Sequence, residues 1–446
     1  MPILPDESLA LLDSFAPVFT QPTRGRFLVL LGAAILTTGR RTVANLLRTA
    51  GSLAPGDASS YRRVFSQARW SMIRLACALT RSLVALLPED APIVLVGDDT
   101  VVAHPGPHVY GKARHRDPVR SSHAYTAWRY GHKWVVLALL VRFPFATRPW
   151  ALPLLVALYQ SEESDHREGH RHRTPAQHMI RLLALMLRWF PGRRFVFVGD
   201  SAYGTHEVAR FVDRHRKRLC LVSKLHPDAN LFEPPPAYQG KGRPPVKGRR
   251  LAKPREAVAA ARRFQRLTVG WYGGGTRRVE THTGTGHWFK SGKGLVPIRW
   301  VFVRDRQGTH RDEYFYTTDV GLSVAQLIGY YTGRWNIETT FEEVRSCLHL
   351  ETTCGWCRKT VLRVTPCLFG LYSVVAWLYN QLPACQRVGS IRWPGKVGVT
   401  FSDALTSVRR WVWLDGVFAQ VRGGADVGKL PEPIRQLLLL ALAPAA

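Results

Sequence analysis

Side chains that can bind a phosphate or a metal ion stand three and four residues apart late in the chain. Tyr331, Arg334 and Glu338 lie in the segment YTGRWNIETTFEEVR, and Arg345 follows seven residues after Glu338. Because residues three and four apart share one face of a helix, these side chains are expected to point at one ligand. A carboxylate beside cationic and hydroxyl donors indicates metal-assisted phosphoryl chemistry.

Two further carboxylates follow apolar runs that are typical of buried strands. Asp98 and Asp200 come at the end of the segments PIVLVGDDT and RFVFVGDS, which read as strands covered on both faces. Ligands of open α/β sheets bind at the carboxyl ends of strands, and carboxylates gathered there hold divalent cations. Either Asp alone also fits a turn cap, so the predicted metal site depends on the three acids together.

With these residues the chain resembles the DDE transposases of bacterial insertion sequences, in particular the cut-and-paste group with a Tyr-x2-Arg-x3-Glu-x6-Lys signature. Tyr331, Arg334 and Glu338 match it, and Arg345 stands where the signature has Lys. The resemblance covers about residues 90 to 380. It implies an α/β fold with a ribonuclease H-like catalytic core interrupted by a β-rich insertion, an N-terminal helical domain and C-terminal helices.

The resemblance implies that Asp98, Asp200 and Glu338 are the catalytic acids and hold two Mg²⁺ ions, with Mn²⁺ as a substitute. The family pattern Asp-x-Thr selects Asp98, with Thr100 as its Thr. A slip of one residue along the strand would instead turn Asp99 toward the metals.

The same resemblance gives Tyr331, Arg334 and Arg345 the role of gripping the phosphate next to the scissile bond. An Arg does so through its planar fork, which can contact two phosphate oxygens at once. The alternative for Arg334 is an ion pair with Glu338 on its own helix.

The implied activity is that of a DNA endonuclease and strand transferase, which cuts the ends of an insertion sequence and joins them to target DNA. Its partner would be double-stranded DNA, both the terminal inverted repeats and the target, bound by a homodimer, with neither a membrane nor a small-molecule substrate. One alternative is a hydrolytic ribonuclease H-like nuclease. Another is a non-catalytic DNA-binding protein derived from a transposase, which the presence of three mutually repelling acids disfavours.

The charge of the chain favours a polyanionic partner. Sixty-two Lys and Arg against 32 Asp and Glu leave a net charge of +30, and neutralising phosphates releases counterions and so drives binding. An acidic membrane surface is the alternative partner. The long apolar stretch 134–158 is interrupted by Arg and Pro residues, which argues against a membrane span.

Cysteine usage predicts a reducing cytoplasm, and the resemblance implies that it is the bacterial cytoplasm with its nucleoid. Seven Cys, an odd number, do not make a disulfide framework. Cys354 and Cys357 form a Cys-x2-Cys pair, but a zinc site needs a second pair of ligands, so both are interpreted as ordinary buried thiols.

The chain length suggests several domains. The predicted divisions are a helical DNA-binding domain at 1–90, the first part of the core at 91–224, the β-rich insertion at 225–318, the last part of the core at 319–383 with the Glu338 helix, and a C-terminal helical region at 384–446. Basic residues flank the predicted N-terminal helices, namely Arg40, Arg41, Arg48, Arg62 and Arg63. A plain packing domain with a solvated basic face fits the same pattern.

A Gly, Arg and Pro segment inside the insertion is predicted to bind DNA. A Pro-stiffened extended chain can lay Arg along a narrow minor groove, and a solvated flexible loop is the alternative. The basic residues of this segment are Lys241, Arg243, Lys247, Arg249 and Arg250.

Histidines near the first acid and tryptophans of the insertion are two further groups that could contact DNA. The His residues between His104 and His132 are interpreted as solvated loop residues. Trp271, Trp288 and Trp300 of the insertion are candidates to stack on a flipped base, with burial in strands as the alternative.

Overall fold

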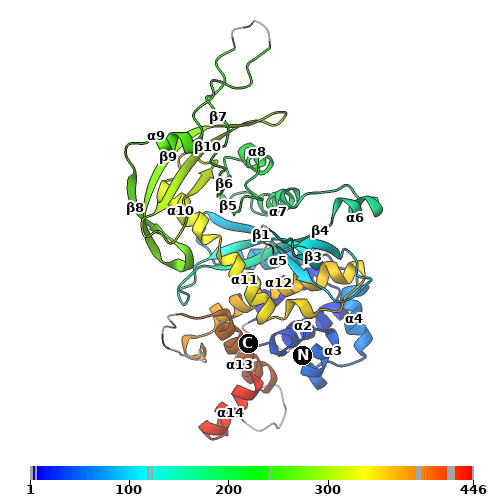
Figure 1. Ribbon diagram of the computed structural model, residues 1–446. Coiled ribbons are helices and arrows are strands. Elements are labelled where there is room, and N and C mark those ends of the chain that lie inside the picture. The colour runs from blue at the N-terminus through cyan, green and yellow to red at the C-terminus, as the bar shows by residue number, and fades with distance from the viewer. Residues whose placement is uncertain are drawn as a thin grey trace.

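The computed structural model describes residues 4–5, 8–117, 121, 124–238, 240, 243–387, 394, 396, 398–418 and 427–443. Its strands form a mixed sheet with helices on both faces (Figure 1). The strands are β1 (Ile93–Ala103), β2 (Ala113–Arg116), β3 (Trp128–Val141), β4 (Trp150–Tyr159), β5 (Phe195–Gly199), β6 (Leu219–Lys224), β7 (Leu231–Phe232), β8 (Gln265–Gly270), β9 (Thr276–Lys290), β10 (Gly294–Asp305) and β11 (Glu313–Thr317).

The central strands follow the order β4, β3, β1, β5, β6. β3 runs antiparallel to both β4 and β1, whereas β1, β5 and β6 are parallel neighbours. Every residue of β5 is buried, as its continuous apolar pattern predicted. This order and these directions are those of a ribonuclease H-like sheet, so the predicted fold class is confirmed.

The β-rich segment continues the same sheet. β11 pairs antiparallel with β6, and β10, β9 and β7 follow outward, with β8 on β9. Four segments of the predicted β-rich insertion have strand-like sequence, namely 264–271, 277–283, 296–303 and 313–317, and they correspond to β8, β9, β10 and β11. The chain between β7 and α9 (Pro254–Ala260) projects far from the body (Figure 1).

Helices cover the two faces of the central sheet. On one face lie α7 (Pro175–Trp189) and α8 (His206–Arg214), and on the other α5 (Met72–Val84), α11 (Asn336–Ser346) and α12 (Arg358–Gln381) (Figure 1). α7 begins at Thr174 and Pro175, a cap and a first-position Pro that are a helix-start signal in the sequence, and Thr174 also forms a capping box with Gln177. The remaining α-helices are α1 (Leu9–Ser14), α2 (Gln21–Leu36), α3 (Val43–Ala50), α4 (Ala58–Ser66), α6 (Glu162–Arg167), α10 (Val324–Gly333), α13 (Phe401–Trp411) and α14 (Glu432–Leu442).

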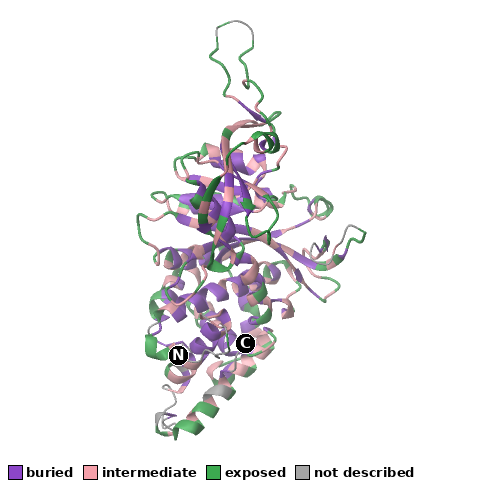
Figure 2. Ribbon diagram, turned by 60° about the vertical axis from the view of Figure 1, so that its left-hand side comes forward, coloured by how far each residue is buried: buried purple, intermediate pink, exposed green. Residues whose placement is uncertain are grey.

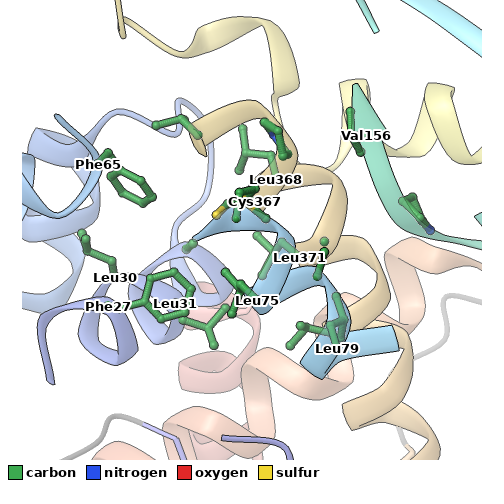
Figure 3. Close-up of a pocket in the computed structure, with 18 of the residues that line it drawn as sticks. Phe27, Leu30, Leu31, Phe65, Leu75, Leu79, Val156, Cys367, Leu368 and Leu371 are labelled. Atoms are coloured by element: carbon green, nitrogen blue, oxygen red, sulfur yellow. The ribbon is translucent and has the colours of Figure 1, made fainter. Parts of the chain in front are cut away.

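The N-terminal helices pack against the core. α2, α4 and α5 contact α12, and α5 also contacts β4. The helical pattern between residues 61 and 87 belongs to two helices, α4 and α5, because Ser71 caps a new N-terminus by accepting from the amide of Arg74. An apolar cavity of about 130 Å³ lies at this seam, and Leu30, Phe65 and Leu368 line it (Figure 3).

Helix α12 is the one helix in the described residues that is long and apolar enough to cross a membrane. However, 78% of its apolar window is buried inside the fold, and the core helix of a folded domain passes the same test. The long apolar stretch examined in the sequence is instead the antiparallel pair β3 and β4. Buried residues gather along the sheet and its covering helices, and the projecting loops are exposed (Figure 2).

Candidate active site

Asp98 and Asp200 lie on neighbouring parallel strands at the same level. β1 and β5 pair in parallel with Gly97 opposite Gly199. Asp98 and Asp200 are the residues that follow these two glycines. β5 ends at Gly199, as predicted. β1 continues to Ala103 along β3, so Asp98 lies inside a strand, and the prediction that this strand ends at the acid was wrong.

The Asp98 carboxylate is removed from water and surrounded by charge. The pKa of Asp98 is raised to about 7, chiefly by burial; the Arg334 guanidinium opposes this rise, and the neighbouring charges of Asp200 and Asp99 contribute to it. At neutral pH this carboxylate is therefore poised between its protonated and ionised forms. A cation placed beside it would favour the ionised form.

Arg334 joins the first and third predicted acids. Its Nη1 donates to Asp98 Oδ2 at 2.6 Å, and its Nη2 donates to Glu338 Oε1 at 2.8 Å. Burial works against its charge, but Asp98 and Glu338 hold the pKa of Arg334 above its ordinary value. The ion pair with Glu338 that the sequence offered as an alternative is present, and the contact with Asp98 comes in addition to it.

The predicted single helix carrying the signature is two helices. α10 ends at Gly333 and α11 begins at Asn336. Arg334 and Trp335 connect them, and the amides of Arg334, Trp335, Ile337 and Glu338 each bond the carbonyl three residues earlier, a tighter turn than an α-helix. The prediction of one continuous face was therefore wrong, although Arg334 and Glu338 still meet.

Tyr331 belongs to the core. Its ring stacks on Phe315 with centroids 4.2 Å apart, and the Arg334 guanidinium lies 5.9 Å from the ring centroid. Burial raises the pKa of Tyr331 above its ordinary value, and the charge of Asp200 adds to this rise. The Tyr331 ring therefore lies against the Arg334 guanidinium and helps to fix its position.

Asp99 points to the opposite face of β1 and has partners there. Tyr203 Oη donates to Asp99 Oδ2 at 2.8 Å, and Lys133 Nζ lies 3.0 Å from Asp99 Oδ1. Of the two neighbouring acids, it is Asp98 that faces Arg334 and Glu338. This geometry favours Asp98 over Asp99 as the first acid.

Arg345 ties α11 to β1. Its Nη2 donates to Thr100 Oγ1 and to the Val101 carbonyl at 3.4 Å, and its Nε lies 3.7 Å from Glu351 Oε1. Glu351 also accepts from Arg129 at 2.7 Å. The final basic residue of the signature thus contacts the Thr of the Asp-x-Thr pattern.

We expect Arg345→Lys to be mild, because Lys can keep the hydrogen bond to Thr100 or the ion pair with Glu351, though not both at once. Single-turnover cleavage should fall by less than about fivefold. Arg345→Ala removes both contacts and should lower cleavage further, which makes it the matched comparison. Equal losses in the two variants would show that the planar guanidinium itself is required at this position.

The basic segment of the insertion is only partly engaged with the rest of the chain. Lys241 lies outside the described residues, and Arg243 is exposed. Lys247 Nζ sits 4.2 Å from the Phe232 ring centroid. The last two residues have polar partners, Arg249 with Glu233 at 2.9 Å and Arg250 with Asn230 at 2.8 Å.

The donor set suits a hard divalent cation, because carboxylate oxygens are its preferred ligands. Within the described part of the chain no three His, Cys, Asp or Glu side chains converge as a preformed cage. Instead the Arg334 guanidinium places its positive charge between Asp98 and Glu338. The residues fit a cation site in which this guanidinium now supplies the compensating charge.

We expect the contribution of Asp98 to the stability of the metal-free protein to fall as pH rises from about 4 to about 7. In this window the folded state keeps a proton on Asp98 that the unfolded state, with a pKa of 3.8, has lost. The free energy of unfolding of Asp98→Asn should therefore gain on the wild type by roughly 1.4 kcal/mol per pH unit across the window. Parallel pH profiles for the two proteins in EDTA would contradict the raised pKa.

Sequence reasoning missed several partners of the site. Lys133 and Tyr203 hold Asp99, and Lys133 had a signal, since it is a charged residue directly before the apolar run 134–141. Lys224 donates to Glu313 beneath the Tyr331 ring. That pair had no local signal, because it joins strands far apart in the sequence.

The interpretation of the His residues as solvated was wrong for three of them. His104, His115 and His132 are buried, because β1, β2 and β3 run together here. Burial lowers the pKa of His132 to about 4, so it is neutral at physiological pH. His123 lies outside the described residues.

Of the Trp candidates for base stacking, Trp288 and Trp300 lie in β9 and β10, and Trp271 directly follows β8. Trp271 and Trp300 are buried, and Trp288 packs edge-on against His206 and Tyr316. The alternative of a buried strand aromatic is therefore confirmed for Trp300, whereas Trp271 is buried directly after the end of β8.

The two Cys of the Cys-x2-Cys pair differ from their interpretation as buried thiols. Cys354 is exposed. Cys357 is half-buried and is the N-cap residue of α12.

A family model described as "DDE superfamily endonuclease" matches residues 14–278 of this chain. The matched region contains Asp98 and Asp200, and Glu338 lies beyond its end. A search of curated proteins finds no match.

Among solved structures, the chain is similar to a cryo-EM structure of the piggyBac transposase synaptic complex with hairpin DNA. The identity is 10% and the TM-score 0.41, over 95% of this chain and 77% of that one.

Proposed function

Because the chain belongs to the DDE superfamily endonuclease family, we propose that it is a DNA transposase that cuts the ends of an insertion sequence and joins them to target DNA. One observation carries the proposal. Asp98 and Asp200 stand side by side on parallel strands, and Arg334 links Asp98 to Glu338 of a helix that follows much later in the chain.

We assign Asp98, Asp200 and Glu338 as the catalytic acids and metal ligands. The DDE endonuclease superfamily generally uses divalent metal ions. Two Mg²⁺ ions, with Mn²⁺ as a substitute, would activate the attacking hydroxyl and stabilise the leaving oxygen when bound. Both Asp98 and Glu338 are available as ligands once the Arg334 guanidinium turns away from them.

Three other residues position this chemistry. Arg334 is a permanent cation that lies against two of the acids and can contact a phosphate through its fork. The Tyr331 ring lies 5.9 Å from the centre of this guanidinium and helps to position it. Arg345 holds α11 in place against Thr100, two residues after Asp98.

The proposed partner is double-stranded DNA, both element ends and target, bound by a homodimer in the bacterial cytoplasm. The net charge of +30 supports this partner. Arg41 is buried and donates to the Cys347 carbonyl, so it is not part of the predicted DNA-binding surface. The other four basic residues predicted for this surface are exposed, namely Arg40, Arg48, Arg62 and Arg63.

A plasmid carrying the DNA that flanks the gene tests the proposal. Purified protein with Mg²⁺ should release a segment bounded by inverted repeats and join it to a second plasmid, and EDTA should abolish both reactions. Cleavage without joining would instead identify a hydrolytic nuclease. Binding to the repeats without cleavage in Mg²⁺ or Mn²⁺ would identify a non-catalytic DNA-binding protein.

A further inference from the structure

The hairpin of β2 and β3 exposes aromatic rings that the core does not use. Tyr125, Trp128 and Tyr130 are 67%, 48% and 60% exposed, all within six residues. Trp128 and Tyr130 occupy alternate positions of one strand, so their rings stand on the same face. Apolar rings grouped in solvent mark a binding surface more often than a packing feature.

Two arginines share this face with the rings. In the β2–β3 register Arg114 is opposite Tyr130 and Arg116 is opposite Trp128. The Arg114 guanidinium lies 4.2 Å from the Trp128 ring centroid, a cation stacked on an aromatic face. Both arginines are exposed, and neither has an acidic partner among the described residues. We call Arg114, Arg116, Trp128 and Tyr130 the hairpin platform.

Neighbouring cations are already neutralised, which singles out the platform. Arg129 pairs with Glu351 at 2.7 Å, and Lys133 pairs with Asp99 at 3.0 Å. Within the described residues of β2 and β3, the uncompensated charges are therefore those of Arg114 and Arg116, beside two flat rings. A ligand complementary to both the cations and the rings carries anionic groups and planar faces at regular spacing. This is the chemistry of a nucleic acid strand.

The platform lies along the strand that passes the candidate active site. β3 places Val136 directly opposite Asp98 on β1, and Tyr130 is six residues earlier on the same strand. At about 3.3 Å per residue this separation is roughly 20 Å, a distance that a few nucleotides can span. A strand held on the platform can therefore reach the acids.

We propose that the hairpin platform binds single-stranded DNA beside the cleavage site. Trp128 and Tyr130 stack on unpaired bases, and Arg114 and Arg116 contact the phosphates between them. A duplex offers no free base faces to these rings, because each base is already stacked on both sides. This inference rests on the proposed function in one respect: the unpaired strand would come from a DNA end that is opened at Asp98, Asp200 and Glu338.

Fluorescence anisotropy in EDTA tests this binding without cleavage. Trp128→Ala/Tyr130→Ala should weaken binding to an oligothymidine of about 20 nucleotides by at least about tenfold, and binding to a duplex of equal length by less than about twofold. Trp128→Phe/Tyr130→Phe retains both rings and should keep most of the single-strand affinity. Equal losses for both DNA forms, or no loss for either, would overturn the proposal.

A second pair of variants tests the arginines. Arg114→Ala/Arg116→Ala should weaken oligothymidine binding several-fold and reduce its dependence on salt. The matched control is Arg167→Ala/Arg216→Ala, which removes two equally exposed cations that already face Glu163 and Asp213. A loss of the same size in the control would show that only net charge matters and would overturn the platform.

The two proposals can fail separately. The anisotropy measurement needs neither metal nor cleavage, so it decides the platform even for a protein that never cuts DNA. Conversely, a protein that cuts and joins element ends while Trp128→Ala/Tyr130→Ala binds oligothymidine normally would keep its proposed function and lose the platform. Cross-linking of 5-iodouracil in the oligothymidine to Trp128 or Tyr130 supplies a direct readout.

Discussion

Asp98→Ala, Asp200→Ala and Glu338→Ala should each lower single-turnover cleavage of element ends by at least about a hundredfold in Mg²⁺. Under the proposed function, each substitution removes one oxygen ligand of a site that depends on three carboxylates together. DNA binding should stay intact or become tighter, because each variant also removes a negative charge that repels phosphate. Gel-based cleavage and anisotropy on the same DNA separate the two effects.

Asp99→Asn is the matched control. Asp99 bonds Tyr203 and Lys133 on the far face of β1, so its substitution should change stability more than cleavage. Thermal melting of every variant shows whether a loss of cleavage reflects unfolding. If Asp99→Asn abolished cleavage and Asp98→Ala retained it, the first acid would be Asp99. Near-normal cleavage by Asp200→Ala or Glu338→Ala would remove that residue from the site.

Local patterns were enough to predict the strands that position the first two acids. The apolar runs before Asp98 and Asp200 predict strands covered on both faces, and burial of the whole of β5 confirms this for Asp200. The same holds for α7, where Thr174 and Gln177 form a capping box that depends on four consecutive residues. Predictions of this kind succeed because the forces that decide them act between near neighbours.

Contacts between distant residues were beyond the sequence. Asp98 and Arg334 are 236 positions apart, and nothing near either residue indicates that the guanidinium closes on that carboxylate. His132 reads as a loop residue among charged neighbours, yet it lies inside β3 and is buried where β1 and β2 flank that strand. Likewise, the β-rich segment was expected as an insertion, and only the pairing of β11 with β6 shows that it extends the core sheet.

Arg334→Lys should lower single-turnover cleavage by roughly a hundredfold while changing overall DNA affinity by less than about threefold. Arg334 now satisfies Asp98 with one nitrogen and Glu338 with another. Lys presents the same charge as a single mobile point, so it can hold one of these acids or one phosphate oxygen but cannot fix an orientation. A shift of about 1 Å at a reacting phosphate can cost roughly a hundredfold in rate. One contact among many adds little to total affinity.

The same variant separates a phosphate-binding role from a purely internal ion pair. If Arg334 only neutralises Asp98 and Glu338, a Lys in its place would leave cleavage nearly unchanged once metal is added, because the metal then supplies the compensating charge. Its melting temperature without metal would still fall. If Arg334 also orients the phosphate, the cleavage defect persists at saturating Mg²⁺, whereas Arg345→Lys stays close to wild type. A cleavage defect that persists at high metal concentration therefore identifies the phosphate-binding role. The ion can replace the charge that Arg334 supplies to the two acids, but it cannot replace a lost contact between Arg334 and the phosphate.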